Sequence, residues 1–127
     1  MDLRGNRVLT RDGFENGIYL GAVNLLNAIR LSTFGTARFN VTLNWGGTSS
    51  SPFTTTADNC KLAFKFNGST LDIFQNGIKV VSATTFAPNL SLMENLIVSP
   101  TGTPKFINSM ALFPTPLTDS QCIAITS

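Results

Sequence analysis

The chain has 127 residues and a mass of 13.6 kDa, which fits one domain, since domains commonly run to about 100–150 residues. Its net charge of +2 comes from nine basic and seven acidic residues without a run of like charges, which argues against a nucleic-acid or anionic-membrane surface. Only 13% of the residues are charged, whereas Ser, Thr, Asn and Gly are common. This composition is typical of an extracellular or virion-like β protein with a neutral, hydroxyl-rich surface.

Targeting and cysteine signals are sparse. No apolar stretch approaches the ~20 residues of a membrane-spanning helix, and MDLRGNRVLT at the start lacks the apolar core of a signal peptide. We therefore expect no membrane partner and no export by the secretory route. Cys60 and Cys122 should be free thiols packed as small apolar residues, with a disulfide between them as the alternative.

The first half of the chain predicts short strands. Residues 1–16, with three arginines among Gly and Asn, form either an arm or a first strand, and residues 17–127 form one β-sandwich domain. Residues 17–23 and 27–33 have strand-like patterning, although LLNAI between them could form one helical turn. Residues 36–45 alternate more clearly. Their predicted apolar face consists of Phe39, Val41, Leu43 and Trp45.

The middle of the chain predicts a loop followed by a meander. GGTSSSPFTTT, residues 46–56, should be a loop of about ten residues, because its Gly, Ser and Thr content and Pro52 oppose a strand. KLAFKFNGSTLDIFQNGIKVVSATTF, residues 61–86, alternates apolar and polar residues around two Asn-Gly pairs, which predicts three antiparallel strands and a type I′ turn at Asn76-Gly77. The lysines of one face should be solvated, or else meet acidic neighbouring subunits: Lys61, Lys65, Lys79 and Lys105.

The end of the chain predicts two more strands and a helical turn. The strands cover residues 90–98 and 105–113, separated by a turn at SPTGTP. Thr118 followed three residues later by Gln121 is a capping-box pattern, so one short helical turn should begin there. About eight or nine short strands with regular turns predict an all-β antiparallel sandwich. The phenylalanines expected in its core are Phe64, Phe66, Phe74, Phe86, Phe106 and Phe113.

Two segments, KLAFKFNGSTLDIFQNGIKVVSA and FINSMALFPTPLTDSQCIAITS, carry a family resemblance. The chain from Cys60 to Thr126 resembles the C-terminal half of concanavalin A-like (laminin-G-like) jelly-roll domains of tailed-phage fibre and structural proteins. The resemblance implies a jelly-roll fold and a place in the phage virion after synthesis in the host cytoplasm. It also implies a homo-oligomer, with a trimer favoured, or assembly with other virion proteins. Because the chain is short for this family, either the sandwich is trimmed or neighbouring subunits complete it.

Catalytic signals are absent. Without histidine, the chain cannot build a Ser-His-Asp or Cys-His centre or a three-histidine metal site. The family that the chain resembles includes glucanases, which need paired carboxylates. The seven acidic residues here lack the E-x-D-x-x-E pattern of those enzymes, so an inactive or unusual glycosidase is a minor alternative. Asp12 and Glu15, the only close pair, lie in a turn-like TRDGFENG, and carboxylates are few for calcium. We expect no enzyme, no cofactor and no metal.

The remaining polar and aromatic residues suggest a glycan contact. Trp45 stands where a predicted strand meets the 46–56 loop, and an indole there could stack on a sugar or instead close the core. Phe53 inside the loop could be an exposed interface anchor. The polar candidates, Asn44, Ser49, Ser50 and Asn76, could instead be ordinary turn residues. The predicted glycan-contact residues are Trp45, Asn44, Ser49, Ser50, Phe53 and Asn76.

Two functional hypotheses follow from the sequence. In the first, the chain is a module at a phage fibre or spike tip that recognises a host surface glycan without cleaving it. In the second, it is a purely structural virion protein, such as a capsid decoration or fibre protein, with a lectin-like fold and no bound sugar. The fold alone does not separate the two, because function resides in the site.

Overall fold

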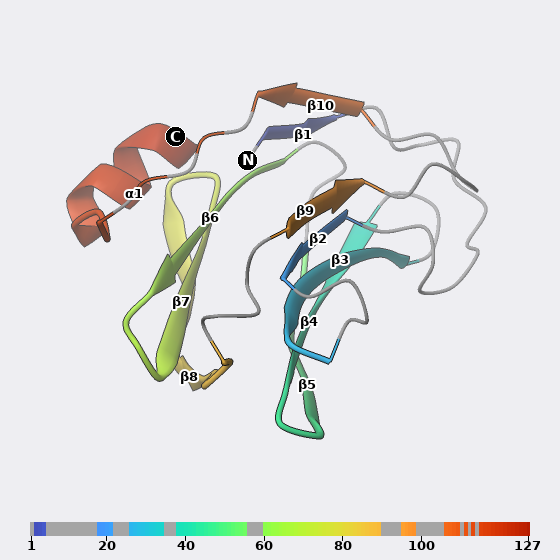
Figure 1. The fold of residues 1–127 in the computed structure, drawn as a ribbon. Coiled ribbons are helices and arrows are strands. Elements are labelled where there is room, and N and C mark those ends of the chain that lie inside the picture. Colours follow the sequence, from blue (N-terminus) through green and yellow to red (C-terminus); the bar gives the residue numbers. More distant parts are fainter. Residues whose placement is uncertain are drawn as a thin grey trace.

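Two antiparallel β-sheets face each other across a shared core in the computed structural model (Figure 1). The first sheet has the order β10-β1-β6-β7-β8 and the second the order β5-β4-β3-β2-β9. A helix, α1 (Asp119–Thr126), lies beside the first sheet. The structure describes residues 2–4, 18–21, 26–34, 38–55, 60–89, 95–98, 106–109, 111, 113 and 115–127.

The strands of each sheet come from distant parts of the chain. The first sheet contains β1 (Asp2–Arg4), β6 (Cys60–Phe66), β7 (Thr70–Gln75), β8 (Ile78–Thr85) and β10 (Phe106–Ser109). The second contains β2 (Ile18–Gly21), β3 (Ala28–Phe34), β4 (Arg38–Trp45), β5 (Thr48–Thr54) and β9 (Asn95–Val98). The N-terminal strand β1 lies between β10 and β6, so residues 2–4 form part of the sheet. The architecture is therefore mostly antiparallel β, in two sheets, with one short C-terminal helix.

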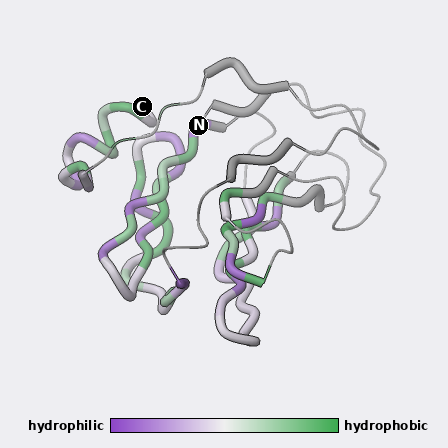
Figure 2. The backbone as a smooth tube through the Cα atoms, in the orientation of Figure 1, coloured by the Kyte–Doolittle hydropathy of each residue, from purple (hydrophilic) through white to green (hydrophobic). Residues whose placement is uncertain are grey.

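Alternating side chains build the core between the sheets. Figure 2 shows hydrophobic and hydrophilic residues following one another along the strands of both sheets. Phe39, Val41 and Leu43 of β4 are buried against Leu62 of β6 and Ile73 of β7, as the period of two predicts. The predicted meander is also confirmed, because β6, β7 and β8 pair in sequence. Asn76 and Gly77 have φ angles of 49° and 80°, as a type I′ turn requires.

The predicted loop over residues 46–56 is wrong, because most of it forms strand β5. Gly46 and Gly47 take positive φ angles of 49° and 78° and reverse the chain within two residues. Pro52 is tolerated because β5 is an edge strand and because the register shifts there, so that Ser51 and Pro52 together oppose Thr42. The Ser/Thr-rich composition thus belongs to a bulged edge strand.

The C-terminal predictions are partly right. The capping box is confirmed: Thr118 Oγ1 accepts from the Gln121 N–H at 3.2 Å, and Gln121 Oε1 accepts from the Thr118 N–H at 2.8 Å. The helix then continues to eight residues, longer than the single turn expected. The last strand ends at Ser109, and Phe113 lies outside it with 50% of its surface exposed, so Phe113 is no core residue.

Helix α1 covers the lysine-bearing face that the sequence predicts to be solvated. It contacts β6, β7 and β8, and Lys65 and Lys79 reach acidic partners there. Phe74 lies on this face too: it is fully buried, but on the side of β7 opposite Ile73. Strand alternation predicted the two faces of the meander, while the helix that covers the outer one comes from far along the chain.

Several predictions fall outside what the structure describes. They concern the turn-like segment around Asp12 and Glu15, the SPTGTP turn, Lys105 and the side chain of Phe106. Of the second-last predicted strand, the described part is β9. Of the LLNAI segment that could have formed a helical turn, Ala28 and Ile29 belong to β3.

Candidate functional site

The six residues predicted to contact a glycan do not meet on one surface. Paired residues of an antiparallel sheet share a face. Trp45 and Phe53 pack against the core, and Ser50 pairs with the buried Leu43, so all three lie on the inner face of the second sheet. Asn44 and Ser49 pair with each other on the outer face. Asn76 is in the turn between β7 and β8 of the first sheet, where its Oδ1 accepts from the Lys61 N–H at 2.9 Å.

Trp45 and Phe53 both serve the core. Trp45 is half-buried, and its ring meets Phe86 edge to face, with centroids 5.7 Å apart and planes at 89°. Phe53 is also half-buried and packs against the same cluster, which differs from the exposed loop anchor that the sequence suggested. This arrangement matches the alternative in which Trp45 closes the end of the core.

The outer face of β3, β4 and β5 carries a connected set of polar side chains, which we call the polar face. Thr54 Oγ1 donates to Asn40 Oδ1 at 3.0 Å, Asn40 Nδ2 donates to Thr42 Oγ1 at 3.3 Å, and the hydroxyls of Thr42 and Ser51 are 3.1 Å apart. The polar face consists of Arg30, Asn40, Thr42, Asn44, Ser49, Ser51 and Thr54.

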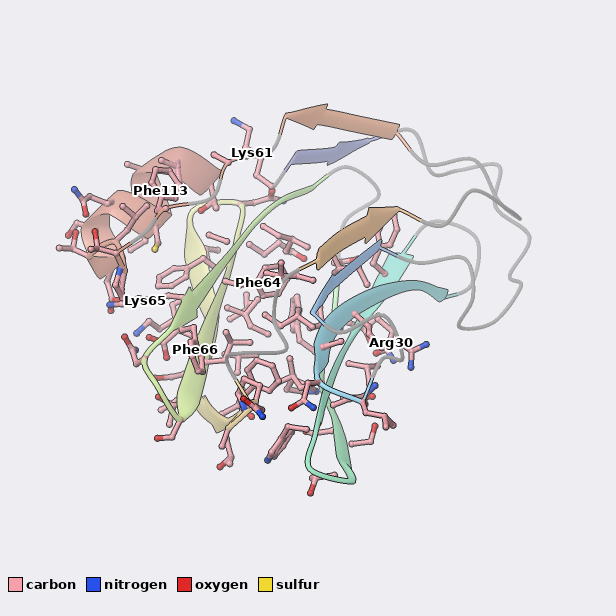
Figure 3. All side chains as sticks on the ribbon, in the orientation of Figure 1. Arg30, Lys61, Phe64, Lys65, Phe66 and Phe113 are labelled. Carbon is pink, nitrogen blue, oxygen red and sulfur yellow. The ribbon has the colours of Figure 1, made fainter. Side chains whose placement is uncertain are left out.

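Strand pairing and one bulge create this face. Arg30 of β3 pairs with Thr42 of β4, and its side chain extends away from the first sheet (Figure 3). The extra residue in β5 brings the Ser51 hydroxyl to the side of Thr42, so a third strand contributes to the same network. Hydrogen bonds between these side chains hold the hydroxyl and amide groups in fixed positions.

The polar face suits a hydroxyl-rich ligand better than an apolar one. Hydroxyls and amides can both donate and accept, as sugar hydroxyls do. Asn40, Asn44 and Thr54 are half-buried, and Ser49 and Ser51 are exposed. Thr42, which links Asn40 to Ser51, is buried and supports the network from beneath. The sequence held a signal for this face, since residues 38–44 alternate Arg, Asn, Thr and Asn with apolar residues. It held none for the contribution of β5, because the composition of that strand predicts a loop.

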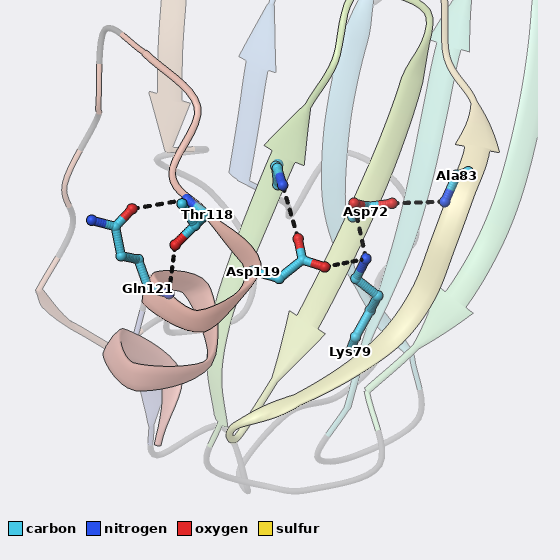
Figure 4. A network of polar contacts seen from close by, with 7 residues as sticks. Asp72, Lys79, Ala83, Thr118, Asp119 and Gln121 are labelled. Carbon is cyan, nitrogen blue, oxygen red and sulfur yellow. Dashed lines mark hydrogen bonds and ion pairs between the residues drawn. The ribbon is translucent and has the colours of Figure 1, made fainter.

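A second polar cluster lies under helix α1 (Figure 4). Asp119 accepts from Lys65 and Lys79, both at 2.8 Å, and Asp72 accepts from Lys79 at 3.2 Å. Asp72 Oδ1 also accepts from the Ala83 N–H at 2.7 Å. Lys79 Nζ lies 5.4 Å from the centroid of the Phe74 ring, within cation–π range. The lysines and a backbone N–H thus occupy both carboxylates, and these contacts hold the helix and the bulge of β8 against the sheet.

Asp72 fixes a bulge in β8, and this predicts the effect of Ala83→Gly. Ser82 and Ala83 oppose Asp72 where the register shifts, and Ala83 has φ 51°, which alanine adopts at a cost. Ala83→Gly should raise the free energy of unfolding by up to about 1 kcal/mol, because glycine takes this conformation without strain. Ala63→Gly in the middle of β6 is the matched control and should lower it by about 0.5–1 kcal/mol. Urea titration of both variants measures the two changes in the free energy of unfolding. If Ala83→Gly lost as much stability as Ala63→Gly, the backbone of Ala83 would not be strained.

Cys122 is a free thiol, so the alternative disulfide with Cys60 does not form. Its side chain is buried between α1 and the sheet, and this burial raises its pKa. Within the described residues, no group of three or more His, Cys, Asp or Glu side chains could hold a metal ion. The same residues include no helix with the length and apolar character to cross a bilayer.

Comparison of the chain with protein-family models, with curated proteins and with solved structures gave no match in any of the three.

Proposed function

We propose that this chain is a non-catalytic jelly-roll module of the phage virion, which binds a neutral host-surface glycan through the polar face. The virion setting rests on the resemblance of the Cys60–Thr126 segment to tailed-phage domains. The glycan rests on one observation, the hydrogen-bonded hydroxyl and amide groups that β4 and β5 present together. The Trp45 and Phe53 contact expected from the sequence is replaced by this face, because both rings pack inward.

A pre-ordered polar network favours sugar binding because the protein groups lose little conformational freedom on binding. Each direct hydrogen bond contributes only about 0.5–1.5 kcal/mol, so a single face without aromatic stacking should bind weakly. Several copies in a homo-oligomer would raise the apparent affinity by multivalency. A weak site that acts through several copies fits the proposed fibre or spike tip.

A glycan array probed with the oligomeric protein tests this proposal. The double variant Asn44→Ala, Ser51→Ala should reduce the signal of any bound glycan by about ten-fold or more, because two contacts are lost. The matched control is Asn67→Ala, Ser82→Ala, which removes exposed polar groups from the β6–β7 connection and from β8 and should leave the signal unchanged. Unchanged Trp45 fluorescence in the two double variants checks that their fold is intact. Loss of signal with Trp45→Phe alone would contradict the polar face and favour the Trp45 contact.

The second candidate function is a purely structural virion protein without a sugar site. The observation that favours it is the use of Trp45 and Phe53 in the core, since sugar sites commonly rely on a flat aromatic surface. A blank array, together with a stable oligomer by light scattering, would support this function and contradict glycan binding. A glycan signal that the Asn44→Ala, Ser51→Ala variant reduces would instead support glycan binding.

A further inference from the structure

Helix α1 is fastened to the first sheet at its N-terminal end by charge. The Asp119 side chain, in the first turn of the helix, accepts from Lys65 of β6 and from Lys79 of β8. The two lysines are largely shielded, with 18% and 28% of their side-chain surface exposed, while Asp119 is 46% exposed. An ion pair with one exposed member is weakened by solvent, so this fastening is modest.

The C-terminal end of α1 is fastened by hydrogen bonds to the same strands. Gly77, in the turn between β7 and β8, donates its N–H to Thr126 Oγ1 at 3.1 Å. Lys61 Nζ of β6 donates to the Ser127 carbonyl at 2.7 Å. The helix is therefore tied at both ends to strands and a turn that lie much earlier in the chain.

Between these ends the helix buries little apolar surface. Among the residues of α1, Cys122 and Thr126 are buried, whereas Ile123 and Ile125 remain 39% and 48% exposed. Phe74 beneath the helix is fully buried, yet it is not part of the core cluster between the two sheets. A helix of eight residues is not stable alone in water, so undocking and unwinding of α1 should occur together.

We propose that α1 is a two-ended strap, which opens as a unit while the two sheets stay folded, and whose closure depends on the charge of Asp119. Opening uncovers a strip of the first sheet made of Phe74, Lys65 and Lys79, an aromatic ring flanked by two cations. The sheets are unaffected because their core is formed by other residues, such as Leu43 and Leu62. Local opening below the free energy of global unfolding is expected where buried apolar contacts are few.

The charges around Asp119 set the pH range in which the strap is closed. The groups that face it are Lys65 of β6, Lys79 of β8, Asp72 of β7 and Cys122 on the helix itself. The hydrogen bond from Lys65, followed by that from Lys79, lowers the pKa of Asp119. Because this pKa is lowered, the Asp119 carboxylate stabilises the closed helix at pH values above about 3.9, the ordinary pKa of an aspartate. This contribution is lost as the pH falls below that value, through the lowered pKa of Asp119. The Asp119 hydrogen bond raises the pKa of Lys79, whose contribution is lost only in strongly alkaline solution.

Two native residues report separately on the strap and on the sheets. Cys122 lies on the buried side of α1, so a thiol reagent can reach it only when the helix opens. Trp45 lies in the core against Phe86, so its fluorescence reports the unfolding of the sheets. The experiment uses the full chain with Cys60→Ser, so that Cys122 is the single thiol, and compares its labelling rate with the rate expected from Trp45-monitored unfolding in urea.

In this chain, Cys122 should be labelled roughly ten-fold or more faster than global unfolding permits. Asp119→Asn should raise the labelling rate a further two- to five-fold while leaving the Trp45 urea midpoint unchanged, since it weakens an exposed ion pair. Ser120→Asn, at an exposed helix position, is the matched control and should change neither. Labelling at the rate of global unfolding, or a rate insensitive to Asp119→Asn, would overturn the proposal.

Discussion

Phe86→Ala should lower the free energy of unfolding by about 3–5 kcal/mol, the loss typical of a large aromatic removed from a packed core. Phe86 is 1% exposed and belongs to the cluster between the two sheets. Its ring meets Trp45 and Phe66 edge to face, each with centroids 5.7 Å apart. Removing it leaves a cavity between two aromatic rings that strands from both sheets hold in place, so collapse around it is limited.

The measurement is a urea titration followed by circular dichroism, because the fluorescence of Trp45 itself changes when its neighbour is lost. Phe113→Ala is the matched control: it removes the same side chain from a position that is 50% exposed. Its effect should stay within about 0.5–1 kcal/mol. Equal losses for the two variants would mean that Phe86 is not a central contact between the sheets.

Gly21→Ala should lower the free energy of unfolding by about 4 kcal/mol or more, because the added methyl group would clash with backbone atoms. Gly21 ends β2 with φ +148°, and a Cβ placed there would lie 2.1 Å from the Asn27 carbonyl oxygen and 2.7 Å from the Ala28 Cα. Both neighbours are backbone atoms, so neither can swing aside. Relief would require β2 and β3 to separate where Gly21 pairs with Ala28.

Gly47→Ala separates this steric effect from the cost of a positive φ. Gly47 has φ +78° in the β4–β5 turn, but a Cβ there meets no atom within 4 Å. Its replacement should cost only about 1–2 kcal/mol, the penalty of a left-handed alanine. Thermal unfolding of both variants checks the contrast, and a milder effect at Gly21 than at Gly47 would be incompatible with the close approach of β2 and β3.

The glycan proposal and the strap proposal concern opposite sides of the molecule and can fail independently. The polar face lies on the second sheet, and α1 covers the outer face of the first (Figure 1). The variants that test one do not touch the other. A chain without a glycan ligand could still open at α1, and a closed helix would leave the polar face unchanged.

Local patterns in the sequence determined the elements whose causes are local. Alternation of apolar and polar residues located β4 and the three-stranded meander, because each depends on side chains two positions apart. The turn at Asn76-Gly77 and the Thr118/Gln121 capping box could be predicted for the same reason, since each depends on residues within four positions of one another. The small number of charges and the absence of histidine also narrow the chemistry that the chain can perform, because both are properties of composition alone.

Only the tertiary structure decided which faces meet. Lys65 pairs with Asp119 across 54 positions of sequence, so the helix-covered face could not be distinguished from a solvated one by alternation. Strand β5 is stabilised by pairing with β4, which overrides the turn-like composition of residues 46–56. The same pairing and its bulge turned Trp45 and Phe53 inward and assembled the polar face, because a one-residue change of register moves side chains from one side of a sheet to the other.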